Sequence, residues 1–305
     1  MATSRGHPNT SAELRSTRAA GGRAEALGVA MKLSMHSICI ERKYPLLEAI
    51  RRAAEFGYHG YEIDIGDFGS TGLGLHWPEE FTADRVAAAG DAAQRAGIEI
   101  SSLCLGVLWR YYPSSPDALD RAQAVEIIRQ SAPLAASVGA RVILLPVGQP
   151  DSLTPEQARD NLVSVLRDCA PAAEAAGVAF AVENVGQALA ETAAHLIEIV
   201  ERVGSPACQV YYDVGNAAWQ NADPIADMRA LGKRIAMVHV KDRRVVDGRG
   251  QMVTIGDGVI DWPSVANVAR EIGYAGYLTL EVPGTAETAD EIAIRSRDAL
   301  RRFGL

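Results

Sequence analysis

Eight short apolar runs recur along the chain from Met31 onward, each followed by a loop and a longer alanine-rich stretch. The longer stretches space their apolar residues with a helical period, as Leu46, Leu47, Ile50 and Ala54 do. The short runs do not alternate with polar residues, which predicts strands buried on both faces, as in a parallel sheet. The predicted strands are Leu33–Ile38, Gly60–Ile65, Ile98–Leu103, Arg141–Leu145, Val178–Glu183, Gln209–Asp213, Ile235–Val240 and Tyr277–Val282.

Glycine and proline mark the ends and the interruptions of the helical stretches. Several stretches end at a glycine just before the next predicted strand, as at Gly57, Gly97 and Gly177, which is typical of a helix C-terminus. Pro133 and Pro171 fall inside two of the helical stretches. Because proline removes a backbone donor and clashes with the preceding turn, we expect each of these helices to be kinked or split.

Eight strand–helix units over about 250 residues predict a single (β/α)₈ barrel. A doubly wound parallel sheet is the competing fold. It would carry a glycine-rich phosphate-binding turn after the first strand, where this chain has Ser37–Glu41. No linker or break in composition divides the chain after residue 30, so the barrel is the better prediction.

The first thirty residues differ from the rest, since they are rich in Ser, Thr, Ala, Gly and Arg and contain no strand-like run. They also lack the apolar region of a secretory signal. We therefore expect residues 1–30 to be a disordered N-terminal extension, with an organelle-targeting segment as the alternative. Residues 31–305 are predicted to form one catalytic barrel domain.

Composition narrows the class of protein. The 305 residues include 30 Lys and Arg against 38 Asp and Glu, for a net charge of −8. An acidic surface repels nucleic acid and anionic lipid, so neither is an expected partner. No apolar run approaches the length of a membrane span. The four cysteines are far apart, which is typical of reduced thiols in a cytoplasmic protein.

Four consecutive predicted strands, the fifth to the eighth, each end on a side chain that can bind a metal ion. A charged group at the end of a buried strand is unfavourable unless it is paired or ligates a cation, and barrel enzymes place their sites at this end. Two Glu, one Asp and one His favour a single divalent cation, Mn²⁺ first, with Mg²⁺ or Co²⁺ as alternatives. A hydrogen-bonded carboxylate–histidine cluster without metal is the other interpretation. The candidate ligands are Glu183, Asp213, His239 and Glu281.

Three segments taken together resemble the sugar isomerase/epimerase branch of the xylose-isomerase-like TIM barrels. They are Tyr212–Asn216, Val238–Asp242 and Ile255–Trp262. The resemblance is closest to the hexulose-6-phosphate isomerase/epimerase group and extends to ketose 3-epimerases. It covers roughly the whole chain from Met31 to Phe303.

This resemblance implies that Glu183, Asp213, His239 and Glu281 bind a divalent metal ion, and that the two glutamates act as acid and base on opposite faces of the sugar. One position departs from the pattern. Many 3-epimerases carry a substrate-contacting His where this chain has Asn216. An amide can hydrogen-bond a hydroxyl or phosphate oxygen but cannot be charged, which favours the phosphosugar-type members over a strict free-ketose epimerase.

Two cationic residues that follow the seventh strand are candidate substrate contacts. Lys241 comes two residues after His239, so on a strand it points to the same side. It is either an electrophile or phosphate partner, or it forms a strand-end ion pair with Asp242 or a nearby Glu. Arg243 begins a long arginine-bearing loop, and it either grips a phosphate or is solvated.

Two candidates lie near the first and third strands. His36, at the end of the first, either contacts a substrate hydroxyl or is a hydrogen-bonded core histidine. Trp109, after the third, either stacks on the C–H face of a sugar or packs under a loop.

The residues and the resemblance together predict a metal-dependent isomerase or epimerase of a ketose or ketose phosphate, acting through an enediolate in carbohydrate metabolism. A dehydratase of a keto-polyol such as an inosose uses the same metal and base and remains an alternative. A DNA-repair endonuclease of this superfamily needs more histidines than the six present. A non-catalytic sugar- or metal-binding barrel is the alternative from another class. The expected partner is a sugar or sugar phosphate, with a homo-oligomer as one option.

Overall fold

The computed structural model describes residues 31–67, 73–220, 222–247 and 249–305. Eight parallel strands form a closed ring, because β1 pairs with β2 on one side and with β11 on the other. A short further strand, β3 (Leu75–Trp77), pairs with β2 at the edge of this ring. The ring strands are β1 (Lys32–His36), β2 (Gly60–Asp67), β4 (Glu99–Cys104), β5 (Val142–Pro146), β6 (Ala179–Glu183), β7 (Cys208–Asp213), β8 (Ile235–Val240) and β11 (Tyr277–Leu280).

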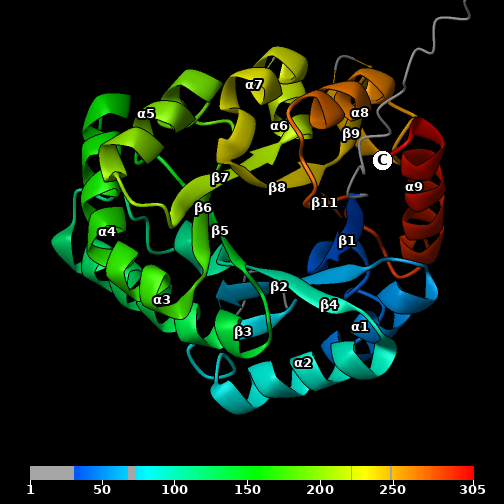
Figure 1. The fold of residues 1–305 in the computed structure, drawn as a ribbon, viewed down its shortest axis with the longest axis horizontal. Helices are drawn as coiled ribbons and strands as arrows, with labels where there is room; N and C mark the ends of the chain where they lie inside the picture. Colours follow the sequence, from blue (N-terminus) through cyan, green and yellow to red (C-terminus); the bar gives the residue numbers. More distant parts are fainter. Residues whose placement is uncertain (1–30, 68–72, 221, 248) are drawn as a thin grey trace, which may run out of the picture.

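Helices surround the ring on its outside (Figure 1). This closed arrangement confirms the predicted (β/α)₈ barrel and excludes the doubly wound sheet. Each predicted strand is present, within a residue or two of its expected ends. The predicted N-terminal extension, residues 1–30, lies outside the described residues. The α-helices are α1 (Leu46–Glu55), α2 (Ala83–Ala96), α3 (Ala118–Ser137), α4 (Pro155–Ala176), α5 (Ala193–Val203), α6 (Val214–Trp219), α7 (Pro224–Leu231), α8 (Trp262–Glu271) and α9 (Ala289–Phe303).

Local sequence signals explain where the helices begin and end. Thr154 caps α4 with its hydroxyl on the backbone N–H of Gln157, while the Gln157 side chain accepts from the Thr154 N–H. The same helix ends at Gly177, whose φ of 66° is a left-handed conformation that favours glycine. Each signal satisfies backbone groups that the helix itself leaves without partners.

The two prolines do not split their helices. Pro133 lies inside the continuous helix α3 and Pro171 inside the continuous helix α4, each near the C-terminal end. Of the two expected outcomes, a kink or a split, the split is therefore wrong at both sites. Packing of the long helices α3 and α4 against each other and against the ring outweighs the lost backbone hydrogen bond.

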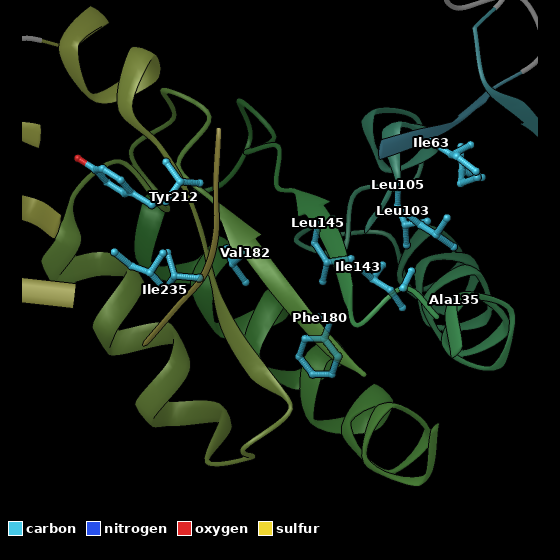
Figure 2. Close-up of a cluster of buried hydrophobic side chains, with 14 of the residues drawn as sticks. Ile63, Leu103, Leu105, Ala135, Ile143, Leu145, Phe180, Val182, Tyr212 and Ile235 are labelled. Atoms are coloured by element: carbon cyan, nitrogen blue, oxygen red, sulfur yellow. The ribbon is translucent and has the colours of Figure 1, made fainter. Parts of the chain in front are cut away.

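Two apolar layers result from the alternation of side chains along each strand. In β5, Ile143 and Leu145 point outward into the large core between the ring and the helices, part of which Figure 2 shows. Val142 and Leu144 belong to the smaller cluster inside the ring. Because successive side chains of a strand point to opposite faces, the residue two positions after an interior residue also faces the interior.

The arginine-bearing segment after β8 is not a loop. It forms a two-stranded antiparallel hairpin of β9 (Asp242–Val246) and β10 (Arg249–Val253). Asp242 fixes the base of this hairpin, since its carboxylate accepts hydrogen bonds from the Gly256 N–H and the Trp262 indole, both at 2.9 Å. The hairpin therefore begins beside the mouth of the barrel, directly after the end of β8.

Candidate active site

The candidate ligands come together inside the ring because each continues the interior face of its strand. Ala181, Tyr211 and Met237 belong to the interior cluster. The side chains two residues further along β6, β7 and β8 are Glu183, Asp213 and His239, and Glu281 directly follows β11. One ligand atom from each of these four residues lies within 4.8 Å of the others.

His239 is the centre of this cluster. Its Nδ1 is 3.2 Å from Oε1 of Glu183, 3.3 Å from Oε2 of Glu281 and 3.8 Å from Oδ2 of Asp213. Asp213 uses its other oxygen, Oδ1, to accept the Asn216 N–H at 2.7 Å and so to cap helix α6. The strand end and the helix start therefore hold this carboxylate in place with Oδ2 facing the cluster.

A fifth residue, Glu62 of β2, orients the imidazole from its other side. Oε1 of Glu62 is 2.7 Å from Nε2 of His239, while Oε2 accepts hydrogen bonds from Ser102 Oγ at 2.5 Å and Tyr211 Oη at 2.8 Å. A carboxylate on Nε2 favours the tautomer that carries its proton there. Nδ1 then faces Glu183 and Glu281 and is the ring nitrogen left to bind a metal ion.

The sequence analysis missed Glu62, although a signal for it exists. Glu62 and Asp64 interrupt the apolar run Gly60–Ile65 at alternate positions, and both are buried. Carboxylates at positions i and i+2 of a strand share one face. They therefore indicate a polar interior on this strand as well as at the ends of the later ones.

Lys241 completes the charge balance of the cluster. Its Nζ is 2.6 Å from Oε2 of Glu281 and 2.7 Å from Oδ2 of Asp213. Of the two interpretations that the sequence left open, an ion pair with a nearby Glu is present, but the partner is Glu281 and not Asp242. The ammonium group therefore lies within the cluster itself.

The acidic groups of the cluster differ in their affinity for protons. Burial raises the pKa of Glu281, but the positive charges of Lys241 and His239 outweigh it and hold this pKa well below its usual range. Burial raises the pKa of Asp213 to about 7, because the Lys241 charge offsets only part of the effect. Burial lowers the pKa of His239, but the negative charges of Glu62 and Glu281 outweigh burial and raise this pKa well above its ordinary value.

The four predicted ligands fit a divalent cation. Asp213 Oδ2 is buried and takes no well-directed hydrogen bond, although Lys241 Nζ is close to it. An imidazole nitrogen and three carboxylates converge on one point, and such an oxygen-rich set with one nitrogen suits Mn²⁺, Mg²⁺ or Co²⁺. The structure thus contains a candidate metal site formed by acidic residues and one histidine.

A cavity of about 310 Å³ opens beside the cluster at the C-terminal ends of the strands. Its volume is within the range of small-molecule sites. Three of the predicted substrate contacts, His36, Trp109 and Asn216, line it together with Lys241. Trp109 is 45% exposed, so it stands at the mouth of the cavity and is not packed under a loop.

Arg243, the remaining predicted contact, lies in a neighbouring cavity of about 340 Å³. The two cavities share Val185, Asn216 and Lys241 in their walls. The Arg243 guanidinium lies over the Trp219 ring at 4.7 Å and donates from Nη1 to the Trp219 carbonyl at 3.1 Å, while its buried Nε has no hydrogen-bond partner. Among the described residues, Arg243 makes no salt bridge with a carboxylate.

Comparison with known proteins places the chain in a family. The family model described as "Xylose isomerase-like TIM barrel" matches residues 50–303. The chain belongs to this family, which confirms the resemblance found in the sequence.

Two of the curated relatives are named as epimerases. The chain is 29% identical to an L-ribulose-5-phosphate 3-epimerase from Salmonella paratyphi A, over 83% of this chain and 87% of the relative. It is likewise 29% identical to the protein of the same name from Shigella sonnei, with the same coverage. Epimerases are isomerases, so the predicted enzyme class is confirmed.

Solved structures of similar fold carry related names. A D-tagatose 3-epimerase-like protein superposes with a TM-score of 0.74 at 23% identity, covering 90% of this chain and 97% of that one. An L-ribulose 3-epimerase gives a TM-score of 0.72 at 21% identity, with 90% and 95% coverage. These two comparisons support the fold.

Along the parts of the chain that the structure describes, no helix combines the length and the apolar character needed to cross a membrane.

Proposed function

We propose that this protein is a divalent-metal-dependent 3-epimerase of a ketose phosphate. The observation that carries the proposal is the pair of carboxylates, Glu183 and Glu281, that flank Nδ1 of His239 at 3.2 and 3.3 Å inside a cavity of sugar-binding size. The epimerase names of the relatives agree with this arrangement. Glu183, Asp213, His239 and Glu281 hold the metal ion in this proposal.

Epimerisation beside a ketone requires removal of a proton from one face of the carbon and its return to the other. A divalent cation held by the four ligands would supply an electrophile for the negative charge that develops on the ketone oxygen. The two glutamates come from β6 and β11, on either side of β7 and β8 in the ring. Each can face a different side of a substrate that lies in the cavity.

In each glutamate one carboxylate oxygen contacts the cluster, and the other is available for proton transfer. Glu183 contacts His239 through Oε1, and Glu281 contacts His239 and Lys241 through Oε2. Among the described residues, neither Glu183 Oε2 nor Glu281 Oε1 takes part in a hydrogen bond. The low pKa of Glu281, set by the charges of Lys241 and His239 against burial, keeps this group ionised as a base. Glu183 would start with a proton on Oε2 and would deliver it to the opposite face, so that one glutamate gains the proton that the carbon loses and the other gives up its own; the two exchange these roles in the reverse direction.

The Arg243 cavity supports a phosphorylated substrate. A guanidinium without a carboxylate partner, fixed over the Trp219 ring, is suited to bind an anion. The shared wall formed by Val185, Asn216 and Lys241 joins this cavity to the one beside the candidate ligands. A ketose phosphate spans both cavities, with its ketone near His239 and its phosphate near Arg243.

Incubation with L-ribulose 5-phosphate and with L-ribulose, each with Mn²⁺ in D₂O, tests this function. We expect NMR spectra to show the 3-epimer of the phosphate with solvent deuterium at C3 and no loss of water. Formation of a dehydrated product identifies a lyase instead. Absence of both epimerisation and exchange with either sugar contradicts the proposal.

A further inference from the structure

A second group of polar side chains lines the same cavity on the side away from Arg243. His36 and Cys104 are the last residues of β1 and β4, Asp64 lies within β2, and a potential ligand atom from each lies within 4.8 Å of the others. All three are buried. Among them, the earlier predictions include only His36.

This group is poorly suited to bind a metal ion. Nδ1 of His36 accepts a hydrogen bond from the Ile38 N–H at 2.9 Å, so a neutral ring carries its proton on Nε2 and has no second lone pair to offer a cation. Burial and the negative charges of Asp64 and Glu62 raise the pKa of the Cys104 thiol well above its ordinary value. A protonated thiol is a weak ligand.

The same features suit a neutral hydroxyl group. Nε2 of His36 is a donor, and the carboxylate that faces it, Glu62, is 3.8 Å away, too far for a hydrogen bond. The Asp64 carboxylate is an acceptor, and among the described residues it forms no ion pair with Lys or Arg. One hydroxyl oxygen can accept from His36 and donate to Asp64, because a potential ligand atom of His36 lies within 4.8 Å of one of Asp64 and two hydrogen bonds of about 2.8 Å can meet at an oxygen between them.

Asp64 is held rigidly in its position. Its backbone N–H donates to Ser37 Oγ at 3.1 Å. A Cβ atom at Gly106 would lie 2.5 Å from Asp64 Oδ1, so the chain after β4 closes tightly on this carboxylate. A fixed carboxylate at this side of the cavity repels a phosphate and accepts a hydrogen bond from a hydroxyl group.

We propose that His36 and Asp64 form a hydroxyl-binding subsite for the end of the substrate that carries no phosphate. The proposal rests on the proposed function for the identity of the substrate. With the phosphate of a ketose phosphate beside Arg243 and the ketone beside His239, the terminal C1 hydroxymethyl group reaches His36 and Asp64. The subsite thus sets the direction in which the sugar lies across the mouth of the barrel.

The test compares the binding of L-ribulose 5-phosphate and its 1-deoxy analogue by calorimetry, in the wild type and in Asp64→Ala and Asp64→Asn. The 1-deoxy analogue lacks the hydroxyl that would hydrogen-bond to the charged Asp64. We therefore expect the wild type to bind L-ribulose 5-phosphate roughly tenfold more tightly than the analogue. In Asp64→Ala this ratio of affinities should fall to about twofold, and in Asp64→Asn it should lie between the values of the wild type and Asp64→Ala. Arg243→Ala should weaken binding of both compounds alike and leave the preference intact.

The inference is overturned if the wild type binds both compounds with equal affinity. It is also overturned if the preference survives in Asp64→Ala and circular dichroism shows that this variant is folded. Lack of binding by either compound also overturns it. Turnover is measured separately in the same samples. A preference that Asp64→Ala abolishes, without epimerisation by the wild type, supports the subsite while contradicting the proposed reaction.

Discussion

Nε2 of His239 lies 2.7 Å from Oε1 of Glu62, and both side chains are almost fully buried. The glutamate itself is held by Ser102 and Tyr211, so the imidazole is anchored to three other strands of the ring. This contact leaves Nδ1 for the candidate metal site. A carboxylate behind a ligating histidine also increases the electron density on the ligating nitrogen.

Glu62→Gln should therefore weaken metal binding. The amide keeps the size of the side chain and can still accept from Nε2, but it removes the negative charge that makes the imidazole a stronger ligand. We expect the Kd for Mn²⁺ to rise by about 10- to 100-fold, measured by calorimetry. Glu99→Gln, an exposed glutamate paired with Lys32, is the matched control. Equal Mn²⁺ affinity in Glu62→Gln and the control contradicts the role given to Glu62.

Removal of metal should lower thermal stability. A ligand that binds only the folded chain stabilises it by about 2.7 kcal/mol at a concentration of 100 times its Kd. For a chain of this size, addition of Mn²⁺ to chelator-treated protein should raise Tm by roughly 5 °C in a calorimetric scan. His239→Ala should abolish this rise. If Mn²⁺ raises the Tm of His239→Ala as much as it raises the Tm of the wild type, the metal binds elsewhere.

Arg243→Ala should distinguish phosphorylated from free sugars. Loss of a guanidinium that contacts the phosphate should raise KM for L-ribulose 5-phosphate by at least about tenfold, since charge-assisted hydrogen bonds are the strong ones. The KM for free L-ribulose should stay the same. The control is Arg244→Ala, the exposed neighbour on the same strand. Equal effects of Arg243→Ala on both sugars exclude a phosphate contact at this position.

The four candidate ligands could be predicted from sequence because each stands at the end of an apolar run. A parallel barrel brings the C-terminal ends of all its strands to one mouth. A position at the end of a strand was therefore enough to predict that these four residues lie close together. The closed ring of strands followed from the same periodicity, whereas the unbroken length of α3 and α4 did not, because Pro133 and Pro171 pointed to a kink or a split.

Other parts of the site depend on contacts between distant segments. The partner of Lys241 is Glu281, 40 residues away, and the sequence alone could not choose between it and Asp242. The placement of Arg243 depends on Trp219 and on a hairpin whose strands are mostly exposed. Glu62 and Asp64 were missed because the run containing them was taken as wholly apolar, although their spacing puts both inside the ring.

The central claim is that Glu183 and Glu281 are the proton-transfer pair, each serving one face of the substrate. The most direct measurement follows deuterium exchange at C3 in D₂O, starting from each epimer separately, with Glu183→Gln and Glu281→Gln whose bound Mn²⁺ has been verified. We predict that epimerisation falls by about 10²- to 10⁴-fold in both variants. Each variant should still exchange deuterium into the one epimer whose proton faces the remaining glutamate. Epimerisation by either metal-loaded variant at a rate within about tenfold of the wild type contradicts the account.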